Sequence, residues 1–496
     1  MIVFYNPHST TPGKQPLPLS VLSLAAVVDG HESWTLVDGN LVDDPAAAIL
    51  EQLPRADGRV APLLAVTVMP GPQLTQAFHV CRRVKAARPD VPIVWGGYFP
   101  TQHADTVLQS PMVDFVVRSQ GERPLLDLLA AQRSGGSLEN VPGLSWRDGE
   151  RHEGRTRHNA VGPPVPLDDL PDLPYARVHM PAYIHSNYLG RRTVAYNSSF
   201  GCPFACSFCA VVAMSGRRWL AQSPARMART LGHLVQTYGI DAVQMHDMDF
   251  FIAEPRTAEF CARIRDLGIR WWALGRVDTL MQYSEDTWRA MARSGLKMVF
   301  AGAESGSDAT LQSMNKGGRA STSLTLELAA RMRRHGVVPE FSFVLGTPPD
   351  PLADVARTFE FIHRIKTVNP AAEVILYTYT PVPLEGALLD RARREGFEFP
   401  STLEEWVSPR WQQLSMRRGD GIPWMEGAVR RRIRDFERVI NAYYPTITDP
   451  RLTGFRRGLL KALSGWRYAL RLYGASYELA AIHRLMHYQR PETTGF

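Results

Sequence analysis

Three of the five cysteines in this 496-residue chain fall within one segment of eight residues, and this cluster carries the most specific chemistry in the sequence. Cys202, Cys206 and Cys209 follow Gly201 and are separated by three and then two residues. Three thiolates on one short loop can bind three irons of a 4Fe–4S cluster and leave the fourth iron open to a small molecule. The alternatives are unrelated thiols or a partial zinc site, but zinc would need a histidine, and none lies in the adjacent stretch.

The two remaining cysteines, Cys81 and Cys261, fall in segments predicted to be helical. An odd number of cysteines in a long chain does not indicate a disulfide framework. Two cysteines cannot supply a second complete cluster. We therefore interpret both as small buried apolar residues.

Length and composition indicate a globular protein of two or three domains, with 45% apolar and 21% charged residues. No apolar run is long enough to span a membrane, and residues 1–5 lack the features of a signal peptide, so we predict a cytoplasmic protein. The net charge of +7 is mild and indicates scattered arginines or a weak preference for acidic partners. No basic platform with interleaved aromatic residues appears, so we predict no nucleic-acid binding.

The elements that position the cysteines begin with an α/β region over residues 1–135. Short apolar strands, predicted at 2–5, 34–37, 63–69, 92–95 and 115–117, alternate with amphipathic helical segments. This alternation predicts a parallel, doubly wound sheet, which binds ligands at the carboxyl ends of its strands. The residues after these strands are rich in glycine and proline, as a flat ligand close to the backbone requires: 6–8, 70–72, 96–98 and 119–122.

Three further regions follow. Residues 136–190 are rich in proline and predict a linker with a small hairpin near 144–147. Residues 191–395 contain six strand–helix repeats and predict a partial (β/α)6 barrel with its site at the carboxyl-terminal face; the strands are expected at 193–196, 242–246, 270–273, 298–301, 340–344 and 374–379. Residues 396–496 are predicted to be a helical C-terminal substrate or capping domain, in which Val429, Ile433, Phe436 and Ile440 share one helix face.

The spacing Cys-x3-Cys-x2-Cys, with Phe208 just before the last cysteine, resembles the radical S-adenosylmethionine (SAM) superfamily. The resemblance covers roughly residues 190–395. It implies that the open iron binds the amino and carboxylate groups of SAM, with Phe208 at the SAM site. It also implies that an electron from the cluster cleaves the sulfonium to give a 5′-deoxyadenosyl radical, and that an external donor of the flavodoxin or ferredoxin type supplies the electron.

Later segments resemble the SAM-contacting motifs of this family in their order along the barrel. The resemblance places Asp247 and Asp249 near the SAM amino group, Glu304 and Ser305 near its ribose or methionine part, and Gly346 beside its adenine. Residues 380–383, followed by Gly386, resemble the turn after the sixth strand. Arg276 is a candidate for the SAM carboxylate. The alternatives are a helix cap for Glu304, an arginine partner for Asp247 and a surface position for Arg276.

The order of the regions resembles the class B, cobalamin-dependent radical SAM enzymes, with residues 1–135 as a flavodoxin-like cobalamin-binding domain. The resemblance implies cobalamin contacts at Asn6, His8, Pro16, Leu17, Met69, Gly96, Gly97, Tyr98, Gly121 and Glu122. This chain differs from the family's usual Gly-Glu-Gly-Glu turn, because Ser119 and Gln120 replace the first Gly-Glu pair. His8 is a candidate cobalt ligand; the alternative is cobalt without a protein imidazole.

Two other interpretations of residues 1–135 stay open. A flavin or nucleotide domain is the first, although no Gly-x-Gly-x-x-Gly motif follows the first strand. A degenerate domain that has lost its corrinoid is the second.

The resemblance implies transfer of a methyl group from methylcobalamin to an unactivated carbon of a small-molecule substrate, such as a natural-product intermediate, after hydrogen abstraction by the 5′-deoxyadenosyl radical. Two alternatives remain open. One is cyclisation or ring rearrangement with both cofactors but no methyl transfer. The other is a non-catalytic corrinoid or metal carrier. The sequence assigns no catalytic residue beyond the cofactor ligands.

Overall fold

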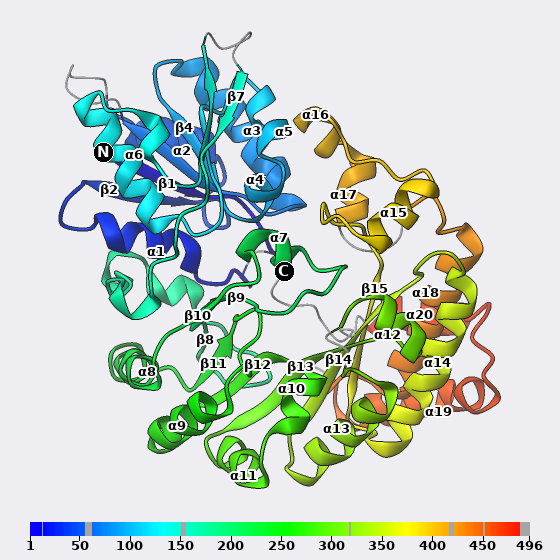
Figure 1. The fold of residues 1–496 in the computed structure, drawn as a ribbon. Coiled ribbons are helices and arrows are strands. Elements are labelled where there is room, and N and C mark those ends of the chain that lie inside the picture. The colour runs from blue at the N-terminus through cyan, green and yellow to red at the C-terminus, as the bar shows by residue number, and fades with distance from the viewer. Residues whose placement is uncertain are drawn as a thin grey trace.

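The computed structural model describes residues 1–11, 13–54, 62–149, 155–316, 319–415, 421–449 and 452–486. Figure 1 shows a first α/β layer, coloured blue to cyan, above a second, coloured green to yellow. The C-terminal helices, in orange and red, lie along one side of the second layer. Within the described residues, no helix is long and apolar enough to cross a membrane.

The first sheet contains the five strands predicted for residues 1–135. Strands β1 (Ile2–Asn6), β2 (Trp34–Asp38), β3 (Leu63–Thr67), β4 (Ile93–Gly96) and β5 (Phe115–Val117) are parallel, in the order β2-β1-β3-β4-β5. This is the flavodoxin-like order of a doubly wound sheet, as predicted. The helices between the strands are α1 (Leu19–Val28), α2 (Pro45–Gln52), α3 (Pro72–Ala87), α4 (Tyr98–Gln102) and α5 (Ala104–Gln109), and α6 (Glu122–Ser134) follows β5.

The hairpin predicted after residue 136 is present, but it belongs to this sheet. Strand β6 (Leu144–Asp148) pairs antiparallel with β5, and β7 (Arg155–His158) pairs with β6. Leu144 and Trp146 are buried in the same apolar cluster as Val117. The hairpin therefore covers the edge that β5 would otherwise leave unpaired.

The second sheet contains all six strands predicted for residues 191–395. Strands β8 (Thr193–Tyr196), β11 (Ala242–Met245), β12 (Arg270–Arg276), β13 (Leu296–Glu304), β14 (Val338–Leu345) and β15 (Glu373–Thr378) are parallel and adjacent in chain order. β8 and β15 are the two edges, so the barrel is partial, as predicted. Its helices are α8 (Pro224–Tyr238), α9 (Glu254–Ile264), α10 (Val277–Gln282), α11 (Glu285–Arg293), α12 (Asp308–Ser313), α13 (Thr322–Arg334) and α14 (Pro351–Val368).

The C-terminal region is helical, as predicted, with helices α15 (Ala387–Arg394), α16 (Leu403–Trp406), α17 (Pro409–Ser415), α18 (Gly427–Tyr443), α19 (Gly454–Leu470) and α20 (Tyr477–Met486). In α18 the predicted apolar face is buried: Val429, Ile433, Phe436 and Ile440. The arginines at 431, 432 and 434 are exposed on the other face.

The two α/β layers meet next to the cysteines. A small antiparallel ribbon of β9 (Ser199–Gly201) and β10 (Trp219–Ala221) precedes and follows the cysteine loop, and α7 (Ala210–Ser215) begins directly after Cys209. Helix α7 packs against α4, which begins after the glycine pair that ends β4. The turn after β4 therefore lies beside the cysteine loop, as Figure 1 shows at the centre of the molecule.

Candidate cofactor site

The three clustered cysteines share one loop between β9 and α7, in which Cys206 is buried and Cys202 and Cys209 are half-buried. The amide of Cys209 donates to the carbonyl of Cys206 at 3.2 Å. Burial, together with the negative charges of Asp249, Cys209 and Cys206, raises the pKa of Cys202 to about 12, which places these groups near one another. Among the described residues, no three His, Cys, Asp or Glu side chains are arranged to hold a single metal ion. A cubane differs because it binds each thiolate at a separate iron.

Asp247 fixes the strand that leads into this loop. Its carboxylate accepts hydrogen bonds from the Ser198 amide at 3.1 Å, from the Ser198 hydroxyl at 2.7 Å and from the Ser199 hydroxyl. Burial raises its pKa, and Arg256 is the nearest opposing charge. Asp247 therefore anchors the start of β9 through Ser198 and Ser199. The charge of Arg256 acts on it, which is close to the arginine pairing considered from the sequence.

Asp249 lies two residues further on and is bonded differently. One carboxylate oxygen accepts from the Phe251 amide at 3.2 Å, and the other is buried without a hydrogen-bond partner among the described residues. Burial raises the pKa of Asp249 to about 7, against the attraction of Arg276. A buried carboxylate oxygen without a partner calls for an explanation, and a ligand that donates a hydrogen bond to it is one. An ammonium group next to the cysteine loop fits this atom.

Arg276, at the end of β12, is buried and holds the cysteine loop. Its guanidinium donates to both carboxylate oxygens of Asp278, at 3.0 and 2.8 Å, to the carbonyl of Lys316 at 2.8 Å and to the sulfur of Cys206 at 3.1 Å. It also lies 3.8 Å from the ring centroid of Phe204. The alternative of a surface arginine is wrong, because only 6% of the residue is exposed.

A second buried ion pair stands beside the loop. Glu304 ends β13 with a φ of 62° and pairs with the ammonium of Lys316. Lys316 lies 5.9 Å from the ring centroid of Phe208, which connects this pair to the cysteines. The alternative that Glu304 caps the next helix is wrong, since Ser307 caps α12. Sequence reasoning missed Lys316, because a single lysine after a short helix carries no pattern.

Ser305 and Gly346 are connected by Asp354 in the first turn of α14. The Asp354 carboxylate accepts from the Ser305 hydroxyl at 3.5 Å, from the Gly346 amide at 3.0 Å and from the Thr347 amide at 3.3 Å. Trp424 of the C-terminal region donates to the Gly346 carbonyl at 2.9 Å. The predicted SAM residues after β13 and β14 are therefore held together by an aspartate that the sequence did not single out.

At the carboxyl end of the first sheet, neutral amides connect the loops that contain Asn6, His8 and Met69. Gln73 of α3 donates to the Asn6 side chain at 3.3 Å and accepts from the Met69 amide at 3.1 Å. Gln76 of the same helix accepts from the His8 amide. Sequence reasoning missed both glutamines, which face this edge only because α3 packs on the sheet.

The remaining predicted cobalamin residues border the same edge. Gly97 has a φ of 97°, and a Cβ there would lie 3.2 Å from the Thr67 hydroxyl and 3.3 Å from the Val68 carbonyl, so only glycine fits this turn without strain. Glu122, after Gly121, accepts from the Ser23 hydroxyl of α1 at 2.5 Å. The others flank these turns: Gly96, Tyr98, Pro16 and Leu17.

Two protein families match the parts of the chain that form these two sheets. Residues 196–362 match the family described as Radical SAM superfamily, and residues 10–129 match the B12 binding domain. The chain is 27% identical over 355 residues to an uncharacterized methyltransferase of Pyrococcus horikoshii, covering 70% of this chain and 73% of the relative. It is 23% identical over 480 residues to the anaerobic magnesium-protoporphyrin IX monomethyl ester cyclase of Rubrivivax gelatinosus, covering 93% and 82%.

Solved structures share the fold. The cobalamin-dependent SAM radical enzyme OxsB with aqua-cobalamin superposes with a TM-score of 0.68 at 15% identity, covering 98% of this chain and 75% of that one. The methyltransferase TsrM from Kitasatospora setae, with tryptophan and a SAM analogue bound, gives 0.64 at 15% identity, covering 94% and 95%.

The two family matches coincide with the two sheets whose carboxyl ends meet. The radical SAM domain implies a 4Fe–4S cluster and SAM, and the B12-binding domain implies cobalamin. The thiol loop, the unpaired oxygen of Asp249 and the glycine turn at Gly97, which carries no side chain, fit these groups. The chain therefore contains a radical SAM domain and a B12-binding domain.

Proposed function

We propose that this chain is a cobalamin-dependent methyltransferase that adds a methyl group to an unactivated carbon of a small-molecule substrate. The observation that carries the proposal is the packing of α4 on α7, which sets the glycine turn of the B12-binding domain against the cysteine loop. When bound, the cluster and SAM supply a hydrogen-abstracting 5′-deoxyadenosyl radical, and cobalamin supplies the methyl group. Both reagents must reach one substrate, so the short path between the two edges supports this division of labour.

The cluster-side residues take three roles in this proposal. Cys202, Cys206 and Cys209 ligate the cluster. Asp249 receives the SAM ammonium through its unpaired oxygen. Arg276 keeps Cys206 in place and offers its positive charge to the SAM carboxylate.

The remaining predicted residues surround the rest of the cofactors. Phe208, Glu304, Ser305 and Gly346 border the other parts of SAM, while Asp247 acts through the loop it anchors. The predicted cobalamin residues line the edge of the first sheet opposite. Under this proposal the chain divides into a cobalamin-binding domain at 1–135, a linker at 136–190, a radical SAM barrel at 191–395 and a helical cap at 396–496 that shapes the substrate pocket.

A cyclase or ring-rearrangement activity is the second candidate, favoured by the match to a named cyclase along 93% of this chain. The two candidates differ in their by-products. Methyl transfer from SAM must release S-adenosylhomocysteine, whereas cyclisation through the same radical releases 5′-deoxyadenosine alone. A non-catalytic corrinoid carrier would release neither.

The test uses the full chain with iron, sulfide and cobalamin restored under anaerobic conditions, then given SAM and dithionite. We expect both S-adenosylhomocysteine and 5′-deoxyadenosine by liquid chromatography and mass spectrometry. A preparation that makes 5′-deoxyadenosine but no S-adenosylhomocysteine contradicts the methyltransferase and leaves the cyclase. In the control variant Cys206→Ala, we expect 5′-deoxyadenosine to disappear.

A further inference from the structure

Helix α19 turns its larger apolar side chains toward solvent. Phe455, Leu459, Leu463, Trp466 and Leu470 are 81%, 40%, 39%, 50% and 65% exposed. Their spacing of four, four, three and four residues places them on one face of the helix. The buried residues of α19 are only one leucine together with Ser464 and Arg467. The helix therefore has the reverse of the usual arrangement, in which the apolar stripe faces the protein.

Three more large apolar side chains are exposed in the following turn and in α20, which Arg467 ties to α19: Leu472, Tyr477 and Leu485, at 51%, 79% and 82%. We call the eight residues the C-terminal apolar surface. Contiguous apolar surface of this kind marks an interaction site in a folded protein.

The C-terminal apolar surface belongs to a fixed part of the fold. Arg467 donates to the carbonyls of Leu472 at 3.1 Å and Gly474 at 2.9 Å, and it pairs with Glu478, so it ties α19 to α20. On the inner side of α19, the ring of Tyr468 stacks on that of Tyr443 of α18, with centroids 4.4 Å apart and planes at 14°. The stripe is therefore held outward by packing on its inner side.

The charge around this surface is strongly positive. Residues 452–486 contain six arginines and lysines and one acidic residue, Glu478, which binds Arg467. Arg456, Lys461 and Arg484 are exposed. Because a second copy would bring like charges together, the surface is complementary to something anionic.

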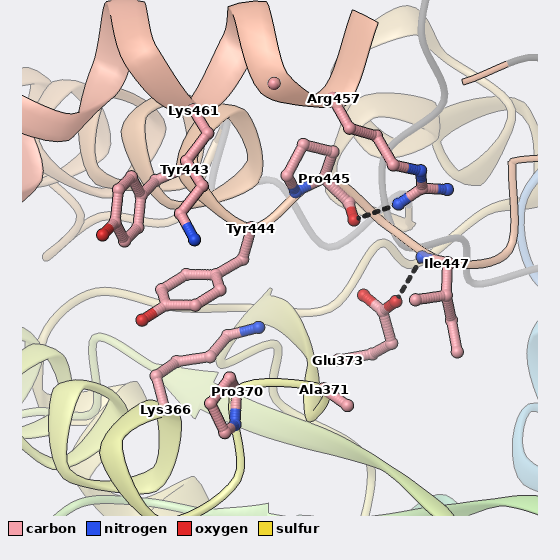
Figure 2. A pocket seen from close by; sticks show the side chains of 11 residues that line it. Lys366, Pro370, Ala371, Glu373, Tyr443, Tyr444, Pro445, Ile447, Arg457 and Lys461 are labelled. Carbon is pink, nitrogen blue, oxygen red and sulfur yellow. Dashed lines mark hydrogen bonds between the residues drawn. The ribbon is translucent and has the colours of Figure 1, made fainter. Parts of the chain in front are cut away.

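Two of these six cations, Arg457 and Lys461, lie on the inner side of the same helix. Figure 2 shows Arg457 and Lys461 pointing from α19 into a cavity of about 250 Å³, where Tyr443 and Tyr444 also lie. Lys366 of α14 lies on the opposite wall, with its ammonium 4.4 Å from the Tyr444 ring centroid. This cavity is on the other side of α19 from the apolar stripe, so its cations strengthen the positive field without contacting the same partner.

We propose that the C-terminal apolar surface docks on an anionic lipid bilayer, with α19 lying in the plane of the headgroups. A helix with tryptophan, phenylalanine and leucine on one face and basic residues beside them binds in this way. The apolar side chains enter the boundary between headgroups and acyl chains, and the flanking arginines and lysines are attracted to the anionic headgroups. This docking is independent of the chemistry at the cysteine loop.

The test is co-sedimentation of the full chain with vesicles of phosphatidylcholine alone or with 30% phosphatidylglycerol, a proportion of roughly one anionic lipid in three chosen for a negative surface potential. We expect binding to the anionic vesicles, weakened by added salt. The double variant Leu463→Glu/Trp466→Glu should lose at least ten-fold in affinity. The matched control Leu126→Glu/Leu352→Glu replaces two leucines of similar exposure, 37% and 40%, outside this surface and should bind like the parent.

Thermal unfolding and SAM cleavage of each variant verify that the fold is intact. If Leu463→Glu/Trp466→Glu fails to fold, the exposed-charge variant Arg456→Gln/Arg484→Gln replaces it, with an expected loss of several-fold. A parent chain that stays in the supernatant with anionic vesicles overturns the proposal, as does equal binding of parent and variant. A parent that light scattering shows as a dimer, and that the variant converts to a monomer, would assign the surface to a second copy and also overturn it.

Discussion

The two parallel sheets of this protein differ in how many charged side chains are buried at the edge that faces their ligands. At the carboxyl end of the first sheet, the loops are connected mainly by the amides of Asn6, Gln73 and Gln76, and Asp38 is a buried carboxylate that accepts from Asn6. At the same end of the second sheet, the cysteine loop is surrounded by buried charges, which are Arg276, Asp278, Glu304, Lys316, Asp247 and Asp249. Both sheets place their site at the carboxyl ends of parallel strands, but the side chains at those ends differ in charge.

This difference matches the two cofactors. A corrinoid is a broad ring bearing amide side chains, so an edge rich in amides, with a turn that carries no side chain at Gly97, can approach it closely. SAM carries an ammonium, a carboxylate and a sulfonium, so it needs charges that are already paired and oriented when it arrives. The parallel sheets therefore provide the position of a site, while the polar side chains at each edge select its ligand.

The largest expected effect comes from removing a cluster ligand. Cys206→Ala should abolish the iron–sulfur absorption and the formation of 5′-deoxyadenosine, because two thiolates cannot retain the cubane. Cobalamin binding at the first sheet should be unchanged. The matched control Cys261→Ala alters a buried cysteine of α9 and should keep the iron–sulfur spectrum. If Cys206→Ala kept the full iron–sulfur absorption, Cys206 would not be a cluster ligand, and the charged edge would not be the cluster site.

The next effect separates the two aspartates after β11. Asp249→Asn should weaken SAM binding by roughly ten- to hundred-fold, since a charged hydrogen bond contributes about 1.5–3 kcal/mol. Asp247→Asn keeps an acceptor for the Ser198 hydroxyl but loses the one for the Ser198 amide. It should therefore lower the melting temperature and leave the affinity for SAM nearly unchanged. Equilibrium dialysis with labelled SAM and thermal unfolding distinguish the two. Equal loss of SAM affinity in both variants would contradict the distinct roles.

At the edge of the first sheet, Gly97→Ala should weaken cobalamin binding and lower the free energy of unfolding by about 1–3 kcal/mol, because the φ of 97° and the contact with Val68 both disfavour a Cβ. Gly30→Ala is the control: its φ is 80°, but a Cβ there would meet nothing within 4 Å. Corrinoid retention on a desalting column measures cobalamin binding, and urea unfolding measures the stability of each variant. Iron content should be unchanged, and a loss of iron in Gly97→Ala would show that the two edges are not independent.

The smallest effect concerns a charge at the opposite end of the second sheet. Burial and the neighbouring Glu373 raise the pKa of Glu340 from 4.5 to about 8, while the Trp272 indole, which donates to it at 3.0 Å, opposes the shift. Between these two pH values the folded chain holds a proton that the unfolded chain releases. The free energy of unfolding should therefore fall as pH rises from about 4.5 to about 8.

Glu340→Gln keeps an acceptor for Trp272 and removes the titration. Urea unfolding at two pH values within this window should show the parent losing at least ~1 kcal/mol more than the variant between them. Parallel loss in both proteins would assign the pH dependence to other groups and confine the role of Glu340 to packing.

Much of the fold was predictable, because strand and helix periodicity is local. All eleven predicted parallel strands are present, and the predicted apolar face of α18 is buried. The attachment of β6 to β5 was not predictable, since pairing at a sheet edge depends on which surface is left uncovered. The reversed face of α19 was also missed, because the spacing of Phe455 and Trp466 is the same whether the stripe faces inward or outward.

The sequence by itself determined the grouping of the three thiols that we predict as cluster ligands, because Cys202, Cys206 and Cys209 are neighbours along the chain and need no tertiary contact to come together. It also determined the two sheets that carry the cofactor domains. Only the tertiary structure decided which acidic side chains are paired and which is open, since Asp249 is distinguished from Asp247 by what surrounds each carboxylate. Lys316 and Asp354 became visible for the same reason: burial and partners far along the chain give a charged side chain its role.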